Sequence, residues 1–214
     1  MTSPIARAGF AVGLLAGQAL FGHVPAIAGT GTVAAKEQSQ AAPAPFVEPD
    51  FIVPTLAETA EFKVMPLGPE LVEVDYAAYM SSIDHLQATF TRSTRWPHAD
   101  ITAADAMQDM VNEEARFAKR ESFAFAVLTS DGSRERGCIY VYPSSVEGYD
   151  AVVTLWVTKA EYDAGFDAQL YEWTQQWLAA EWPFESVAYP GRAIEWARWD
   201  ARVALSHEAG TASQ

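Results

Sequence analysis

The stretch LWVTKAEYDAGFD, from Leu155 to Asp167, predicts a strand that passes into a helix through a loop with one glycine, Gly165. The apolar run ends at Val157, and apolar residues then recur at helical spacing. Such joints often hold phosphates, because backbone N–H groups at a helix N-terminus point outward and carry partial positive charge. This joint also carries acidic residues that oppose an anion: Glu161, Asp163 and Asp167.

The segments around this joint predict a meander and a helix. Three strand-like runs, SFAFAVLT (122–129), RGCIYVYP (136–143) and DAVVTLWV (150–157), are separated by the turn sequences SDGS and GY, which favours antiparallel pairing. The first run is apolar on both faces, as in an interior strand. Cys138 lies within the second run and is predicted to fill the core. The helix after the joint carries an apolar stripe that ends before Pro183: Phe166, Leu170, Trp173 and Trp177.

The flanking segments complete the domain. A strand in EFKVMPL (61–67) precedes a helix over 70–86 and a loop, TRSTRWPHAD, over 91–100. Thr102 is predicted to cap the next helix, with Asp105 completing a capping box. That helix presents an apolar face bordered by Glu114: Met107, Met110, Val111, Phe117 and Ala118.

A short strand is predicted in ESVAYPG (185–191), and RAIEWARWDARVAL (192–205) fits either a terminal helix or an edge strand. The order is therefore strand, helix, helix, three-stranded meander, helix, strand. We expect an α+β (α/β) domain with a mixed, mainly antiparallel sheet flanked by helices.

The two ends of the chain are predicted to lie outside this domain. Residues 1–28 have the pattern of a secretory signal, with an apolar run and a small-residue cleavage site ending at Ala28. We therefore expect an exported, periplasmic protein; the alternative is an unstructured start on a cytoplasmic protein. Residues 29–54 read as an Ala/Pro/Gln-rich linker, 55–205 as the domain and 206–214 as a flexible tail.

Composition limits the classes of partner. The chain has 214 residues and a net charge of −14, with no cluster of Lys and Arg, which argues against nucleic acid as a partner. The acidic balance suits a cationic small-molecule substrate or serves solubility. A single cysteine excludes an internal disulfide and a cysteine-rich metal site, so no metal is expected. The apolar run near the N-terminus is too short and glycine-rich for an integral membrane span.

The element order, with particular residues, resembles the GCN5-related N-acetyltransferase (GNAT) superfamily from about Glu61 to Tyr189. FKVMPLGPE resembles the strand and turn that open many members, and RGCIYVYP resembles the third strand, where a glycine precedes an apolar run. DYAAYMSSIDHLQATF is similar to a subgroup of exported or uncharacterised members. LWVTKAEYDAGFDAQLYEW stands where the family places its cofactor motif.

The resemblance implies acetyl-CoA as co-substrate. In the family, a loop of the form Gln/Arg-x-x-Gly-x-Gly/Ala begins five residues after a strand valine, which places Tyr162 first, Gly165 in the centre and Asp167 last. Gly165 matches; Tyr162 and Asp167 depart from the pattern, and Lys159 stands where a proline is common. The implied cofactor-binding residues cover the strand backbone and the loop: Leu155, Trp156, Val157, Lys159, Tyr162, Gly165 and Phe166.

Catalytic residues follow from the same resemblance and from residue type. Family members often place a tyrosine after the fifth strand, which corresponds to Tyr189, as the acid for the leaving thiolate. Candidate bases are Asp84, His85, Glu114 and Asp150. The loop that would face the acceptor amine contains four further polar or aromatic residues: Arg95, Trp96, His98 and Asp100.

Three functions remain open from the sequence. The first is transfer of an acyl group from acyl-CoA to an amine. The second is an exported, non-catalytic small-ligand-binding module on the same fold, with a cleft lined by Trp96, Trp156 and Tyr162. The third is a different enzyme that has lost CoA. Acetyl-CoA is a cytoplasmic metabolite, so an exported member would lack its donor.

Overall fold

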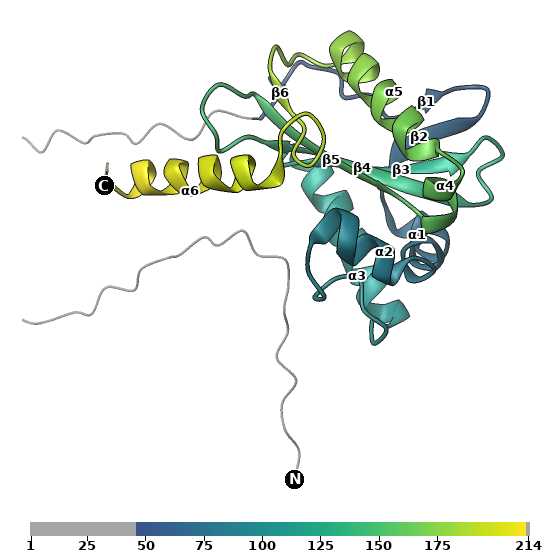
Figure 1. Ribbon diagram of the computed structural model, residues 1–214. Coiled ribbons are helices and arrows are strands. Elements are labelled where there is room, and N and C mark those ends of the chain that lie inside the picture. The colour runs from purple at the N-terminus through teal and green to yellow at the C-terminus, as the bar shows by residue number, and fades with distance from the viewer. Residues whose placement is uncertain (1–45, 213–214) are drawn as a thin grey trace, which may run out of the picture. The chain divides into compact units, whose positions relative to one another are not determined.

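The computed structural model describes residues 46–212, so the predicted signal and most of the predicted linker lie outside the described residues. The described chain contains a six-stranded sheet in the order β1-β2-β3-β4-β5-β6 (Figure 1). Strands β1 to β5 pair antiparallel, and β6 pairs parallel to β5. The mixed, mainly antiparallel sheet confirms the predicted fold class. The strands are β1 (Ala57–Glu58), β2 (Phe62–Pro66), β3 (Phe123–Thr129), β4 (Glu135–Pro143), β5 (Ala151–Val157) and β6 (Val187–Ala188).

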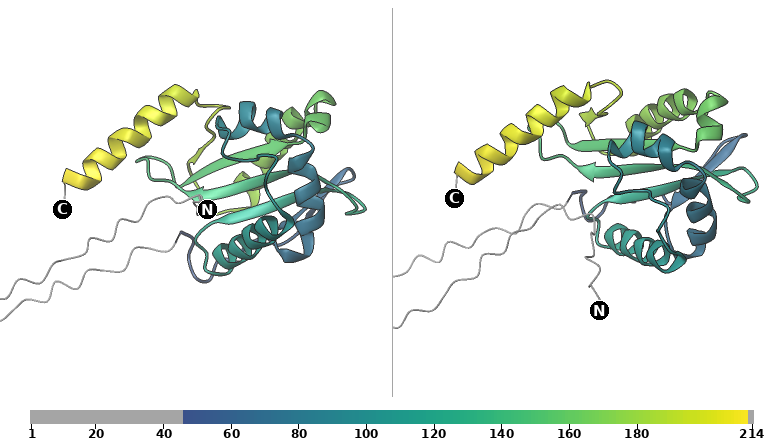
Figure 2. Two further views of the ribbon diagram at one scale, coloured as in Figure 1. Left: turned by 90° about the horizontal axis from the view of Figure 1, so that it is seen from below. Right: turned by 60° about the horizontal axis from the view of Figure 1, so that its bottom comes forward.

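Helices cover both faces of this sheet. In Figures 1 and 2, α5 lies over one face, and α1, α2 and α3 lie over the other. The helical segments are η1 (Pro69–Leu71), α1 (Val72–Met80), α2 (Ile83–Leu86), η2 (Gln87–Thr91), α3 (Ala103–Ala118), α4 (Lys159–Asp163), α5 (Phe166–Glu181) and α6 (Trp196–Ala212).

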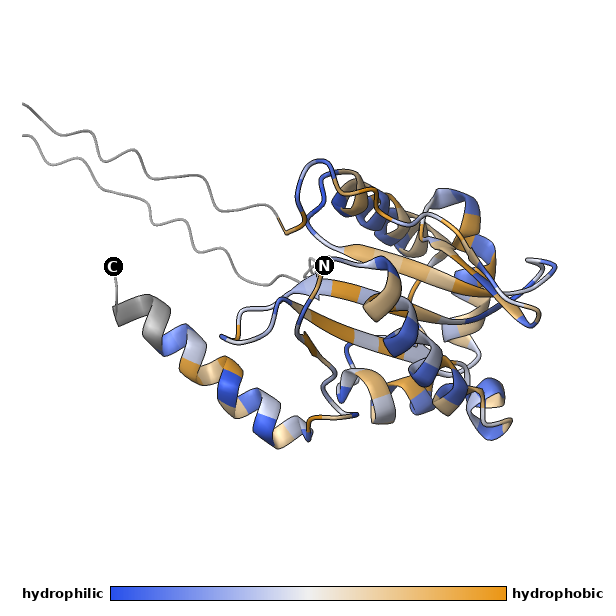
Figure 3. Cartoon of the chain, turned by 90° about the horizontal axis from the view of Figure 1, so that it is seen from above, coloured by the Kyte–Doolittle hydropathy of each residue, from blue (hydrophilic) through white to orange (hydrophobic). Residues whose placement is uncertain are grey.

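The two-residue period of a strand divides the core between the faces. On β3, Phe125 and Val127 pack on the α5 side, whereas Ala126 and Leu128 pack beneath α1 and α3. Figure 3 shows the strands largely in the hydrophobic colour and blue segments along the helices. The interior position predicted for β3 is confirmed, since all its residues except the last are buried.

Two helix predictions need correction. The capping box of Thr102 and Asp105 is present at the start of α3, but Met107 and Val111 are exposed rather than part of the buried face. Met110 is buried as predicted and Phe117 packs against the core, but Ala106 is buried in place of Met107 and Val111, so the buried face is turned relative to the predicted stripe. The single helix predicted over 70–86 is broken near Ser82, whose hydroxyl accepts a hydrogen bond from the backbone of the α4 segment.

Strand β4 contains a bulge that sets the direction of several side chains. The register with β3 shifts so that Val127 faces Gly137 while Leu128 faces Glu135, leaving Arg136 as the extra residue. Gly137 lies against β5, where a Cβ would approach the carbonyl oxygen of Trp156 to 2.0 Å. Only glycine fits this position.

The ends of the domain extend beyond the predicted limits. Val47 is buried and the ring of Phe46 stacks on Phe123, so packing begins before residue 55. Helix α6 resolves the ambiguity between a terminal helix and an edge strand, and it continues to Ala212 through residues predicted as a tail. Among the described residues, no helix combines the length and apolarity needed to span a membrane.

Candidate groove beside strand β5

The parallel pair β5–β6 is short. It is paired at Ala151 and Val152 only, after which no strand of the described chain pairs with β5 on this side. The rest of the β5 edge, from Val153 onward, faces the segment that follows β6. This arrangement leaves a strand edge at which an extended ligand can form backbone hydrogen bonds.

A groove lies along this edge. It is contributed by β5, by η2 and by the segment from the end of β6 to the start of α6: Thr89, Phe90, Val153, Thr154, Leu155, Tyr189, Pro190, Gly191, Arg192 and Trp196. Its free volume is about 20 Å³, which is room for about one water molecule. The groove is therefore nearly closed in this conformation.

Tyr189 is one of the groove residues and was predicted from the sequence. It is 8% exposed, and its ring packs edge-on against Tyr171 at a centroid distance of 5.4 Å. Burial, with a smaller effect of Tyr171, raises the pKa of Tyr189 to about 12. The phenol is therefore protonated near neutral pH, although burial makes it a weaker acid than an exposed tyrosine.

The loop predicted to hold a diphosphate contains helix α4. The Thr158 side chain caps α4, and the N–H groups of Tyr162 and Gly165 donate to backbone carbonyls within the turn. Gly165 has φ +83, with open space where a Cβ would lie, so it serves as the left-handed link into α5. Most of the loop amides are thus bound internally, and outward N–H groups remain at the first turn of α5.

Asp167 occupies that first turn. Its carboxylate forms a two-pronged ion pair with Arg192, including a bond from Nη2 to Oδ1 of 2.7 Å. The side chains are 14% and 27% exposed respectively. This pair joins the start of α5 to the segment after β6. A diphosphate bound at the first turn of α5 would have to displace it.

The side chains of the remaining predicted cofactor residues lie on both sides of the sheet and at the surface. Leu155 and Val157 are buried on the α5 side with Phe166, and Trp156 is buried on the opposite side. Lys159 is at the surface and pairs with Asp163.

The predicted bases lie apart from the groove lining. His85 packs against Tyr162 at 4.9 Å, and burial followed by the charge of Lys159 lowers the pKa of His85. Asp84 and Glu114 are exposed on α2 and α3.

Two further predicted groups have structural partners. Asp150 accepts two backbone hydrogen bonds of 2.8 Å from Glu185 and Ser186, which holds the start of β6. In the loop over 91–100, Trp96 packs against Tyr79, so the loop is anchored on the core; Arg95, His98 and Asp100 lie in the same loop.

The cleft expected for a non-catalytic binding module is not assembled. Trp96 and Trp156 pack together at 6.3 Å within the core beneath α1 and α3. Tyr162 is 48% exposed and contacts His85 instead. The three side chains therefore do not line one open cleft.

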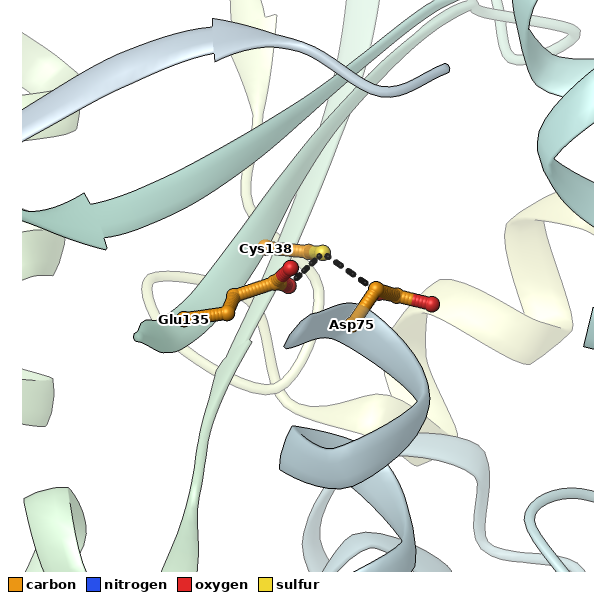
Figure 4. A group of neighbouring side chains, drawn as sticks. All are labelled: Asp75, Glu135 and Cys138. Atoms are coloured by element: carbon orange, nitrogen blue, oxygen red, sulfur yellow. Dashed lines mark hydrogen bonds between the residues drawn. The ribbon is translucent and has the colours of Figure 1, made fainter. Parts of the chain in front are cut away.

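Sequence reasoning missed a buried acidic cluster. Asp75 from α1 and both Glu135 and Cys138 from β4 point toward one another in the core (Figure 4). Burial raises the pKa of Asp75 to about 7 and, with the charge of Asp75, raises that of Glu135. The sequence analysis assigned no role to Glu135, which the bulge in β4 turns inward.

A second missed group joins β4 to α4. Glu161 accepts hydrogen bonds from Arg134 and Arg136, at 2.7 and 2.6 Å. Burial alone would raise the pKa of Glu161, but the two guanidinium groups bring it below its ordinary value. The Arg136 guanidinium also stacks 3.4 Å over the ring of Phe166, which fixes the joint between β5 and α5.

No family model and no curated protein matches the chain. Among solved structures, the chain is similar to the ribosomal-protein-S5-alanine acetyltransferase from Vibrio fischeri, with 15% identity and a TM-score of 0.46 over 58% of this chain and 67% of that one. It is also similar to the microcin C7 self-immunity acetyltransferase MccE, solved with acetyl-CoA and AMP, with 11% identity and a TM-score of 0.42 over 58% and 67% of the two chains.

Proposed function

We propose that the chain binds an acyl-CoA along the free edge of β5 and transfers its acyl group to an amine. The observation that carries this proposal is the short β5–β6 pair, which leaves the backbone from Val153 onward without a partner strand and beside a groove. The amides of a pantetheine arm have the spacing and polarity of an extended peptide, so they can bond to such an edge.

The diphosphate would lie at the first turn of α5, where N–H groups point outward. Asp167 opposes an anion there, and Arg192 is the cation that neutralises it. Binding therefore requires Arg192 to exchange the carboxylate of Asp167 for a phosphate, which would also widen the groove. The supporting chemistry is the preference of a guanidinium for two-pronged contacts with either group.

Transfer would use Tyr189 as the acid. An acceptor amine attacks the thioester carbonyl, the C–S bond breaks, and the phenol of Tyr189 donates its proton to the leaving thiolate. No carboxylate or imidazole is among the groove-lining residues of the described chain. His85 contacts the Val157 end of β5, about 13 Å along the strand from Val153. The amine proton would therefore leave through water.

A thermal shift of the full chain with acetyl-CoA tests binding. A ligand at a hundred times its Kd stabilises the folded state by about 2.7 kcal/mol. An increase in Tm that saturates with acetyl-CoA supports the proposal, and no increase at millimolar acetyl-CoA contradicts it.

The location of the protein is a separate proposal, and it competes with acyl transfer because an exported chain would lack acetyl-CoA as its donor. The signal-like N-terminus supports export, with cleavage after Ala28. Cell fractionation with intact-mass measurement tests it: a processed periplasmic product is expected, and an unprocessed cytoplasmic product contradicts it.

A further inference from the structure

We propose that Asp75, Glu135 and Cys138 bind one divalent transition-metal ion, with Zn²⁺ as the best match, in the core between α1 and β4 (Figure 4). Each residue offers one ligand atom, and the three atoms lie within 4.8 Å of one another. A thiolate with two carboxylates is a donor set that zinc accepts, whereas Mg²⁺ and Ca²⁺ require oxygen ligands alone.

The distances between donor atoms suit a tetrahedral ion. Bonds of about 2.3 Å to sulfur and about 2.0 Å to oxygen at the tetrahedral angle place S and O about 3.5 Å apart. In the structure, Cys138 Sγ is 2.9 Å from Glu135 Oε1 and 3.8 Å from Asp75 Oδ1. The two distances bracket the required sulfur–oxygen separation, so small side-chain rotations would bring both carboxylates to bonding distance from an ion bound by Cys138 Sγ.

Among the described residues, no positively charged side chain pairs with the two carboxyl groups of this cluster. All three residues are buried, and Glu135 Oε2 has no hydrogen-bond partner. A buried unpaired oxygen costs about 1–3 kcal/mol. No Lys, Arg or His within the described residues forms an ion pair with Asp75 or Glu135, and the two α3 side chains whose charges act on Asp75, Asp109 and Glu113, are also acidic. A bound cation would satisfy the free oxygen and neutralise the cluster.

The backbone builds this arrangement specifically. Glu135 and Cys138 are three residues apart, so a regular strand would point them to opposite faces of the sheet. The bulge at Arg136 places both beneath α1 and sends Arg136 to the α5 side. Tyr79, one helical turn after Asp75, also has a buried hydroxyl without a hydrogen-bond partner.

Metal analysis of the full chain tests the proposal. Protein purified without chelator should contain about one zinc per chain by mass spectrometry, and chelation should lower the Tm. Co²⁺ added to the chelated protein should give the near-ultraviolet absorption of a cobalt–thiolate bond. The proposal is overturned if the protein is metal-free and neither Zn²⁺ nor Co²⁺ changes its Tm or spectrum; the cluster is then a set of protonated acids.

Two variants separate this site from surface binding on an acidic chain. Glu135→Gln and Cys138→Ser keep side-chain size, and each should weaken zinc binding at least tenfold; Cys138→Ser should also abolish the cobalt–thiolate absorption. Glu114→Gln makes the same charge change on an exposed part of α3 and should leave zinc binding unchanged. Equal zinc binding in all three variants overturns the proposal. If a variant fails to fold, the chelation and cobalt measurements on the unmodified chain still decide the question.

Discussion

Asp167→Asn should strengthen acetyl-CoA binding. Asp167 places a negative charge at the first turn of α5, and its ion pair holds Arg192 away from a ligand. Removing a unit charge about 4 Å from a phosphate gains about 1 kcal/mol even at the dielectric constant of water, and more in a partly buried site. Since 1.4 kcal/mol is a factor of ten, the Kd should fall five- to tenfold or more.

Isothermal titration calorimetry of both proteins with acetyl-CoA measures this change. Asp163→Asn is a matched control, because it removes the same charge from an exposed carboxylate on α4 rather than from the first turn of α5. Pantetheine, which lacks the diphosphate, should bind Asp167→Asn and the unmodified chain alike. Unchanged or weaker acetyl-CoA binding by Asp167→Asn would refute the placement of the diphosphate.

Three further predictions follow from named contacts. Tyr189→Phe should lower kcat for acyl transfer by about a hundredfold and leave the Kd for acetyl-CoA unchanged, as thiol-release and calorimetric assays would show. Glu161→Gln should destabilise the fold by about 2–3 kcal/mol in urea unfolding near neutral pH. Because the pKa of Glu161 is lowered in the folded state, its stabilisation is present above about pH 4.5 and lost as the pH falls, so the two unfolding curves should converge in acid. Gly137→Ala should lower the free energy of unfolding by at least about 3 kcal/mol, because its Cβ would collide with β5. Gly148→Ala, with φ +86 and open space around it, should lower it by only about 1 kcal/mol. Equal losses in the two variants would contradict the close approach of Gly137 to β5.

Local patterns predicted much of this fold because they depend on neighbours in the chain. The meander follows from apolar runs separated by turn residues, and the capping box at Thr102 follows from a three-residue spacing. The stripe containing Phe166 and Leu170 predicted which face of α5 is buried. The α3 stripe was right for Met110 and wrong for Met107 and Val111, which share a helical face that is exposed.

The candidate sites were harder to predict because they depend on contacts distant in the sequence. Tyr189 was predicted from its place after a strand and lines the groove, but its role stays a prediction. Arg192 gave no signal, since its partner Asp167 is 25 residues away. Glu135 was missed because a bulge, which has no clear sequence signature here, reverses its direction. Regular alternation of side chains along β4 would place Glu135 on the α5 side of the sheet, whereas the bulge at Arg136 places it on the α1 side.

Hydrogen exchange of the full chain with and without acetyl-CoA tests directly whether the ligand lies along β5 and at the start of α5. A pantetheine arm bonded to the β5 edge should slow amide exchange in peptides covering 153–157, and a diphosphate at α5 should slow exchange at 166–168. We expect slower amide exchange in both segments and little change in β2, which β3 and β4 separate from β5 in the sheet. Bound acetyl-CoA that protects neither segment, or protects only other parts of the chain, would contradict this placement of the ligand.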